Sequence, residues 1–422
     1  MCIRDSFYGI GMKVYDQLAG RLGLEPSRFL NREETIKRIP TVEQENLQGG
    51  VVYHDGQFDD SRLAINLAQT AQENAGILCN YCRCTGLIKE NGAVSGVTVY
   101  DIEGDREFMV GAKAVINATG VFVDELRKKD QPTTTNIVTV SQGIHIVLPK
   151  EFLPGDSAIM IPKTDDGRVL FAVPWNDHVV VGTTDTALAN ASLEPRALQE
   201  ERDFVMTHVC KYLTKNPTEA DVLSVFAGLR PLVKSGDGSD TAALSRDHSI
   251  LISESGLISL TGGKWTTYRK MAEDVIDQAE TLGDLEPKTC ATANLPIHGW
   301  TDRTTQSDHL CVYGFDRDKI LKLTRTHPKL NEQIHDALPY LKAEVIWQVR
   351  YEMARTVEDV LARRTRALLL NASASIEAAA VVAELMAQEL GRDQRWQVDQ
   401  EQAYRELARG YVFTDPRSIG LG

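Results

Sequence analysis

Three basic side chains occupy sequence positions at which a positive charge needs an anionic partner. Arg230 lies within the otherwise apolar run FAGLRPLV, and Arg246 lies in the run SRDH, shortly before an expected strand at residues 250–252. Lys264 follows two consecutive glycines in the segment LTGGKW. A guanidinium that leaves water needs a negative charge beside it. Two arginines and a lysine can together clamp a dianionic phosphate.

Structural ion pairs offer a second explanation for the two arginines. Arg230 could pair with Asp185, and Arg246 with its neighbour Asp247. A phosphate clamp and a pair of structural salt bridges use the same residue types, so the sequence leaves both interpretations open.

The glycines before Lys264 lie where an expected strand, residues 257–260, becomes an expected helix, residues 266–282. The N-terminus of a helix carries about half a positive charge, which suits a phosphate or an electron-rich ring edge. Thr266 and Thr267 can cap this helix or donate to a ligand. The alternative is a glycine-rich turn with a surface lysine, but the convergence of these features favours a binding site.

A second strand end also consists of small residues. The expected strand at residues 114–117 runs into Ala118, Thr119 and Gly120, and a helix should start at Phe122 or Asp124. Small residues let the backbone come close to a ligand at a helix N-terminus. Strands also end this way in ordinary turns.

His145 begins an apolar strand, residues 145–148, and is the candidate general base. In that role it would take a proton from a substrate hydroxyl, although a lone histidine in such a setting is often a core residue. Thr183 and Thr184 follow another strand, residues 179–181, and their paired hydroxyls could face a ligand or simply form a turn capped by Asp185.

Three of the seven cysteines cluster as C-x-x-C-x-C at Cys79, Cys82 and Cys84. A metal site would need a fourth ligand, and none stands nearby, so we expect no metal. We interpret the cluster as reduced thiols along a buried strand at residues 77–84. An odd cysteine count without a signal-peptide pattern favours a reducing, cytoplasmic compartment.

Composition limits the function classes. The chain has 422 residues, and its 46 Lys and Arg against 59 Asp and Glu give a net charge of −13, which argues against a nucleic-acid-binding protein. The length suggests about two or three domains. No apolar run reaches the roughly 18 residues that span a bilayer.

The expected elements change character along the chain. A helix at residues 61–74 should be capped by Asp59 or Asp60, and a mainly helical region should occupy residues 316–413. One apolar helix face is expected along residues 344–370, and another helix at residues 7–22. Other expected strands and helices cover residues 97–100, 106–110, 169–173, 194–213 and 223–226.

In order along the chain, these segments resemble the FAD-dependent glycerol-3-phosphate dehydrogenases. The resemblance rests on the stretches YHDGQFDDSRLAINLAQTA, INATGVFVDELR, SQGIHIVL, IPKTDDGRVLFAVPWNDHVVVGTTDT, FAGLRPLV, SRDHSI, LTGGKWTTYRKMAEDVID and ARTVEDVLARRTRALLL. It implies an α/β (α+β) fold of the amino-acid-oxidase-like group. Such a fold has a Rossmann-type FAD domain, a mixed-sheet substrate domain and an all-α C-terminal domain.

The resemblance also implies an activity. The family oxidises sn-glycerol 3-phosphate to dihydroxyacetone phosphate and passes electrons to quinone. It works as a cytoplasmic protein peripheral to the inner face of the membrane, and a homodimer is one assembly it allows. A glycerol-3-phosphate oxidase that uses oxygen, or an inactive fragment acting as a binding or assembly module, are the alternatives.

The resemblance assigns roles to single positions. Arg246 and Lys264 would bind the substrate phosphate, Arg230 the oxygen on C2, and His145 would take the hydroxyl proton while hydride leaves for the flavin. Thr183 and Thr184 would line the pocket. The residues expected near FAD are Ala118, Thr119, Gly120, Gly228, Gly262, Gly263, Lys264, Thr266 and Thr267.

One feature of the resembling family has no counterpart here. The family opens on a strand, G-x-G-x-x-G and a helix that hold the FAD pyrophosphate. We therefore expect an N-terminally truncated chain with an FAD/substrate domain at residues 1–298 and a helical domain at residues 299–422. The expressed 422-residue polypeptide is expected to purify colourless, and a flavin spectrum in the preparation would refute this.

Overall fold

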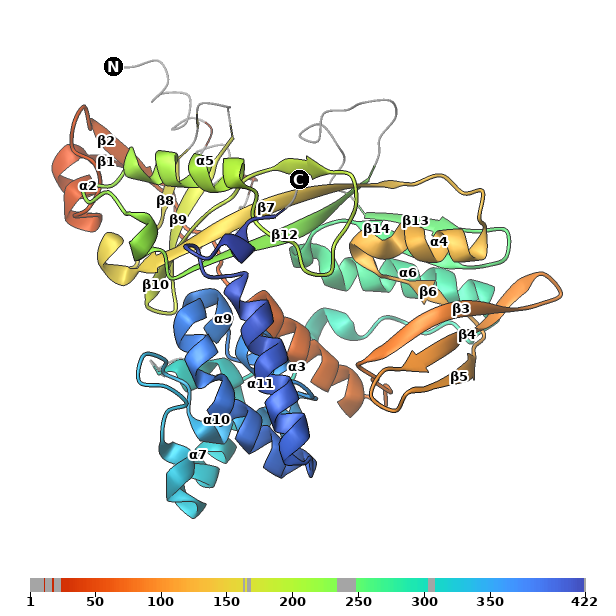
Figure 1. The fold of residues 1–422 in the computed structure, drawn as a ribbon. Coiled ribbons are helices and arrows are strands. Elements are labelled where there is room, and N and C mark those ends of the chain that lie inside the picture. Colours follow the sequence, from red (N-terminus) through yellow and green to blue (C-terminus); the bar gives the residue numbers. More distant parts are fainter. Residues whose placement is uncertain are drawn as a thin grey trace.

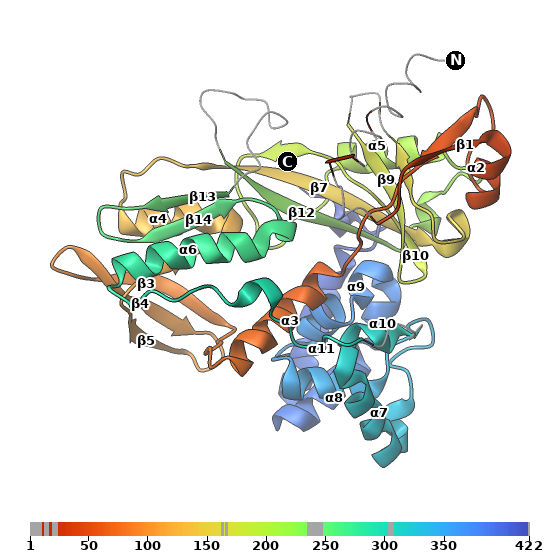
Figure 2. The ribbon, with the colours of Figure 1, turned by 180° about the vertical axis from the view of Figure 1, so that it is seen from behind.

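The computed structural model describes residues 11, 17–18, 24–161, 164, 168–233, 248–302 and 308–420. A long twisted sheet crosses the top of the molecule in Figure 1 and carries helix α5 on its outer face. A smaller α/β unit lies to the right of it and a bundle of helices below it; Figure 2 shows the same three parts from behind. The expected helix at residues 7–22 lies almost entirely outside the described residues.

The large sheet has six strands, and all its pairings are antiparallel. Its strands are β7 (Val138–Pro149), β8 (Ile159–Ile161), β9 (Leu170–Trp175), β10 (His178–Gly182), β11 (Thr186–Leu188) and β12 (Ser224–Val233). Side chains alternate between the faces of a strand. Ile144, Ile146 and Leu148 of β7 therefore point into one core with Val205 and Val209 of α5 (Gln199–Cys210). The opposite face of β7 points away from this core.

The smaller unit contains a parallel pairing between two strands. Strand β14 (Ile258–Gly262) pairs antiparallel with β13 (His248–Ile252) and parallel with β6 (Ile116–Asn117). Helix α6 (Tyr268–Leu282) covers β14 by burying Val275 and Ala279 against Ile258. The other elements of this unit are η2 (Gly120–Phe122), α4 (Val123–Asp130), η6 (Trp265–Thr267) and the antiparallel strands β3 (Cys82–Glu90), β4 (Ala93–Asp101) and β5 (Arg106–Gly111).

The C-terminal region is helical, as the sequence predicts. Its elements are α7 (Arg317–Thr326), α8 (Lys342–Tyr351), a π-helical turn (Asp359–Arg364), α9 (Ala367–Leu370), α10 (Ala372–Leu390) and α11 (Gln394–Arg409). Asn371 caps α10 by accepting from the Ala374 amide, and Gly391 ends it in the left-handed conformation. The buried alanines of α10 let its neighbours pack closely around it.

Several expected boundaries are confirmed and others are wrong. Asp59 caps α3 (Asp60–Glu73), as predicted. Residues 344–370 do not form one helix, because the backbone takes positive φ angles at Met353 and Arg366 and breaks the chain into shorter elements. Residues 77–84 are not one strand either, since β3 begins only at Cys82. The remaining elements near the N-terminus are β1 (Arg28–Asn31), α2 (Arg32–Arg38) and β2 (Gly49–Val52).

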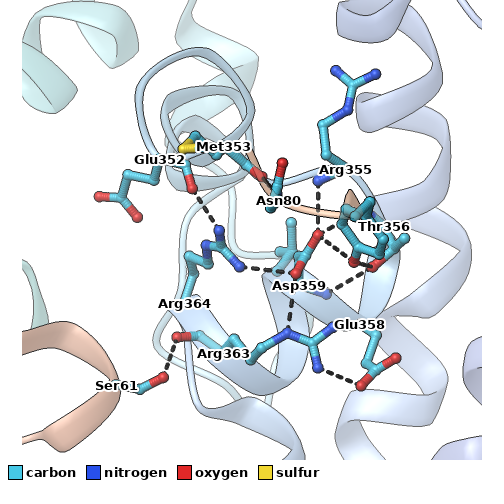
Figure 3. A network of polar contacts seen from close by, with 12 residues as sticks. Ser61, Asn80, Glu352, Met353, Arg355, Thr356, Glu358, Asp359, Arg363 and Arg364 are labelled. Atoms are coloured by element: carbon cyan, nitrogen blue, oxygen red, sulfur yellow. Dashed lines mark hydrogen bonds and ion pairs between the residues drawn. The ribbon is translucent and has the colours of Figure 1, made fainter. Parts of the chain in front are cut away.

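Polar contacts join α3 and the loop before β3 to the helical region (Figure 3). Asp359 is 3% exposed and accepts hydrogen bonds from the amides of Arg355 and Thr356 and from the guanidinium groups of Arg363 and Arg364. Nearby, Arg62 of α3 donates to Glu352 over 2.7 Å, and both side chains are buried.

Among the described residues, no helix combines the length and apolar character needed to cross a bilayer.

The Arg62–Glu352 pair should contribute strongly to stability. Glu352→Gln removes the negative charge and leaves the Arg62 guanidinium buried without its counter-ion, which costs about 3–5 kcal/mol. Asp177→Asn, which breaks the exposed pair with Lys150, should cost less than about 1 kcal/mol. Urea unfolding of both variants measures the difference, and equal losses would contradict this ranking.

Candidate active site

The face of β7 that points away from α5 carries polar side chains and one glycine. Pairing with β12 places His145 opposite Phe226, Gly143 opposite Gly228, and Ser141 opposite Arg230. Because residues two apart on a strand share a face, these six positions form one patch across the two strands. The sequence predicted His145, Gly228 and Arg230 as separate site residues, and the sheet register brings them together.

Arg230 is held in place by the loop that follows β10. Its Nη2 donates to the Thr183 hydroxyl over 3.2 Å, and its Nη1 lies 3.3 Å from the Thr184 carbonyl oxygen. The same Nη1 is 3.4 Å from Oδ1 of Asp185, which also accepts a hydrogen bond from Ser141. The ion pair that the sequence left as an alternative is therefore present. Its members are both about one-third exposed, which leaves the guanidinium accessible to a ligand.

Gly143 provides the space that Arg230 occupies. A Cβ atom at this position would lie 2.4 Å from the Thr183 hydroxyl oxygen and 2.5 Å from Nη2 of Arg230. Sequence reasoning did not single out Gly143. A glycine inside an apolar strand signals close approach of another group, and the run SQGIH carries that signal.

His145 lies on the same face of the sheet as Arg230. Its ring stacks on Phe226 with centroids 5.2 Å apart, and a Cβ on Gly182 would lie 2.3 Å from the ring. Burial, with a smaller contribution from the positive charge of Arg230, lowers the pKa of His145 to about 4. The imidazole is therefore neutral at physiological pH, which is the form that can accept a proton.

The lowered pKa predicts a pH-dependent cost to stability. The unfolded chain protonates this histidine below about pH 6.5, whereas the folded chain resists protonation until about pH 4. Between pH 8 and pH 5, wild type should thus lose about 2 kcal/mol more stability than His145→Gln. Chemical unfolding at the two pH values measures this, with His327→Gln as the control for an exposed histidine. A parallel pH dependence in wild type and His145→Gln would show that the ring is not shielded.

Thr184 lies elsewhere than the sequence suggested. Its side chain is 1% exposed, and its hydroxyl donates to Glu201 of α5 and accepts from the Ile144 amide. The expectation that Thr184 lines the pocket with Thr183 is corrected, because the Thr184 hydroxyl bonds to α5 whereas the Thr183 hydroxyl accepts from Arg230. Its role is to fix the loop that holds Arg230.

Strand β14 lies beside β12, one of the two strands of this patch. Strand β14 and the 3₁₀ turn η2 both contact β12. Gly262 and Gly263 have φ angles of 74°, a conformation that glycine adopts without strain. Lys264 is exposed, and the Thr267 hydroxyl donates to the Lys264 carbonyl and so closes the turn that opens α6. Among the described residues, the Lys264 ammonium has no ion-pair partner.

The end of β6 forms another side of the same region. Asn117 is fully buried, and its side chain donates to the Val123 carbonyl and accepts from the Thr119 hydroxyl. Ala118 and Thr119 are exposed just beyond it. Added Cβ atoms on Gly120 and Gly228 would meet nothing within 4 Å, so both glycines border open space. Arg246 lies outside the described residues.

Comparison with known families supports a specific relationship. The family of FAD dependent oxidoreductases matches residues 10–269. The C-terminal domain of alpha-glycerophosphate oxidase matches residues 255–397. Together the two matches cover the sheet units and most of the helical region.

Individual relatives agree with these matches. The chain is 36% identical to the probable mitochondrial glycerol-3-phosphate dehydrogenase of Caenorhabditis elegans, covering 96% of this chain and 59% of that protein. It is 33% identical to a mitochondrial glycerol-3-phosphate dehydrogenase of Arabidopsis thaliana, covering 97% of this chain and 70% of that protein. The chain thus spans about three-fifths of the length of the first of these relatives.

A solved structure shows the same fold. The glycerol-3-phosphate dehydrogenase of Bacillus halodurans, complexed with FAD, superposes with a TM-score of 0.79 at 28% identity, covering 93% of this chain and 81% of that one. The fold is the FAD-binding fold of this family followed by a helical C-terminal domain, as the sequence predicted. On these matches, the chain belongs to the FAD dependent oxidoreductases and, among them, to the glycerol-3-phosphate dehydrogenases.

Proposed function

We propose that this chain carries the substrate site and the flavin-facing side of an enzyme that oxidises sn-glycerol 3-phosphate to dihydroxyacetone phosphate. The observation that carries the proposal is the patch on which Arg230 and neutral His145 lie together, on strands of which β12 also contacts β14. The names of the relatives give the substrate class.

The described residues fit the flavin end of FAD. Gly120 and Gly228 border open space, and Gly262 and Gly263 keep side chains away from the end of β14. Ala118, Thr119 and the run from Lys264 to Thr267 are exposed, and we assign them to the same flavin-facing side. A flat ring can approach backbone at such positions. When bound, FAD accepts the hydride that the substrate carbon loses.

We assign the contacts to the substrate from the charges around Lys264 and Arg230. Lys264 has no counter-ion among the described residues, and with Arg246 it supplies positive charge for the phosphate. Arg230 already shares its charge with Asp185, so its remaining donors suit the single oxygen on C2 better than a dianion. The fork that Thr183 and Asp185 hold fixes the direction of those donors.

His145 takes the proton from the C2 hydroxyl. The imidazole makes no hydrogen bond within the described part of the chain, so a ring nitrogen is available to the substrate. Its pKa of about 4 keeps the ring neutral before the reaction. A dianionic substrate beside the ring would raise this pKa and improve its power as a base.

For the electron acceptor, we propose a quinone that the enzyme meets as a peripheral protein at a membrane surface. The match to the C-terminal domain of alpha-glycerophosphate oxidase favours oxygen as the second candidate. Steady-state assays of the FAD-loaded protein with a short-chain quinone and with oxygen decide between them. Reduction of the quinone at least tenfold faster than peroxide release supports the dehydrogenase, and the reverse ratio supports the oxidase.

A further inference from the structure

A buried carboxylate lies behind the patch that carries Arg230. Glu201 belongs to α5, which covers the face of the large sheet opposite to this patch (Figure 1). Glu201 is 2% exposed, and Val205, one turn further along the same side of the helix, packs into the apolar core. A carboxylate in such a layer costs free energy unless hydrogen bonds replace the lost water. The presence of a charged residue type at this position therefore needs an explanation.

Three donors surround the Glu201 carboxylate. Oε1 accepts a hydrogen bond from the Thr184 hydroxyl over 2.8 Å. Oε2 accepts from the side-chain amide of Gln142 over 2.7 Å and from the backbone amide of Leu198 over 3.0 Å. Gln142 belongs to β7, Thr184 to the loop after β10, and Leu198 is the N-cap residue of α5. One side chain thus joins a strand, a loop and the start of a helix.

The loop after β10 depends on side-chain contacts for its position. Residues 183–185 follow β10 and precede β11, so they lie outside the register of the sheet. The Thr184 hydroxyl donates to Glu201 and accepts from the Ile144 amide over 3.0 Å. Two hydrogen bonds therefore hold this hydroxyl from two sides, and Glu201 supplies one of them.

The same loop holds the guanidinium of Arg230. The Thr184 carbonyl oxygen accepts from Nη1 over 3.3 Å, and the Thr183 hydroxyl accepts from Nη2 over 3.2 Å. Thr184 thus bonds to Glu201 through its side chain and to Arg230 through its backbone. A shift of the Thr184 side chain moves the carbonyl oxygen of the same residue, because both are attached through one Cα atom.

We propose that Glu201 is a positioning residue for Arg230. From the face of the sheet that α5 covers, Glu201 holds the loop at residues 183–185, and this loop sets the direction of the guanidinium on the opposite face. The consequence for the reaction rests on the proposed function, in which Arg230 binds the oxygen on C2 of the substrate. Glu201 acts on the substrate only through this loop.

Two neighbouring carboxylates give a matched pair of substitutions. Glu201→Gln keeps the size of the side chain but replaces one acceptor oxygen by an NH₂ donor, which must face either the Thr184 hydroxyl or two other N–H donors. Glu200→Gln makes the same change at an exposed position. Both residues lie in the first turn of α5, so both variants lose one negative charge near the helix N-terminus. A difference between the two variants therefore reports on the buried hydrogen bonds.

Amide hydrogen exchange of the full chain without FAD tests whether Glu201 holds the loop. Residues 182–186 should exchange about threefold faster or more in Glu201→Gln and at the wild-type rate in Glu200→Gln. Helix α10 serves as the remote reference and should exchange at the wild-type rate in both variants. Unchanged exchange at residues 182–186 in Glu201→Gln overturns the proposal. An equal acceleration in α10 also overturns it, because that result marks a general loss of stability.

A second pair of variants applies if Glu201→Gln does not fold. Thr184→Val keeps the shape of the side chain but removes the hydroxyl that Glu201 holds, whereas Thr184→Ser keeps the hydroxyl. Faster exchange at residues 182–186 in Thr184→Val than in Thr184→Ser is the expected result. Equal exchange rates in these two variants contradict the proposal.

Kinetics of the FAD-loaded protein test the route through Arg230. Glu201→Gln should lower kcat for glycerol 3-phosphate about tenfold and leave KM within about threefold of wild type, since a displacement of about 1 Å costs roughly 10²-fold and a smaller one costs less. In the Arg230→Ala background the same substitution should have no further effect, because the group that it positions is absent. Losses that multiply in the double variant overturn the route through Arg230.

The two kinds of measurement separate this inference from the proposed function. If Glu201→Gln shows the expected exchange but the wild type does not oxidise glycerol 3-phosphate, the proposed function fails and the link between Glu201 and the loop is confirmed. If the wild type oxidises glycerol 3-phosphate and Glu201→Gln matches Glu200→Gln in exchange and kinetics, the inference fails and the proposed function is supported.

Discussion

Replacing Arg230 with alanine should lower kcat/KM for glycerol 3-phosphate by about 10²–10³-fold in the FAD-loaded protein. We propose that Arg230 is a preorganised cationic donor at the reacting oxygen, and loss of a donor of this kind has an effect of that size. The substitution also removes one cation from beside the Asp185 carboxylate, which leaves more negative charge next to an anionic substrate. Steady-state kinetics with flavin content measured for each preparation give the result.

Two further substitutions give this prediction its controls. Arg230→Lys keeps the charge but loses the planar fork that contacts both Thr183 and Asp185, so it should recover only part of the activity. Arg395→Ala removes an arginine whose side chain is 89% exposed on α11 and should leave the kinetics unchanged. Activity of Arg230→Ala within threefold of wild type would remove Arg230 from the site.

Gly143→Ala should lower kcat/KM by about 10²-fold although it adds only one methyl group. The new Cβ would overlap the Thr183 hydroxyl and Nη2 of Arg230, so the guanidinium must move. A displacement of about 1 Å in a positioned group costs roughly this factor. Most of the loss should appear in kcat, because the atoms nearest to the added methyl group belong to Thr183 and Arg230 and not to Lys264, which we propose as a phosphate ligand.

Gly111→Ala is the matched control, since its added Cβ has no neighbour closer than 4.0 Å. Gly228→Ala, across the strand from Gly143, should not change stability because its Cβ would enter open space. Lower flavin occupancy in Gly228→Ala would then come from the ligand and not from the fold. Unaltered kinetics in Gly143→Ala would mean that Arg230 does not need its observed position.

The sequence predicted the parts of the site that depend on local signals. Three of these signals can be recognised from the sequence alone: glycines at strand ends, a basic residue in an apolar run, and a histidine at the start of a strand. The register that places His145 opposite Phe226 and Arg230 opposite Ser141 depends on pairing between strands about 80 residues apart. Local periodicity cannot set that register.

Other features were missed for similar physical reasons. The Arg62–Glu352 pair joins residues separated by 290 positions, and only the packing of α3 on the helical region brings them together. The prediction of one helix along residues 344–370 was wrong because positive φ angles at Met353 and Arg366 interrupt it. Methionine and arginine rarely adopt positive φ, so the sequence gives no sign of these breaks. Thr184 was misplaced because two adjacent hydroxyls look equivalent in sequence although they bond to different partners.

Anaerobic titration of the FAD-loaded protein tests the proposed substrate site most directly. The absorbance of oxidised flavin near 450 nm is followed while sn-glycerol 3-phosphate is added, with unphosphorylated glycerol and the Arg230→Ala variant as comparisons. Bleaching by glycerol 3-phosphate at concentrations at least 100-fold below those of glycerol, with dihydroxyacetone phosphate as the product, is the expected result. Equal bleaching by both compounds, or none by glycerol 3-phosphate, would contradict the assignment of this patch as a glycerol 3-phosphate site.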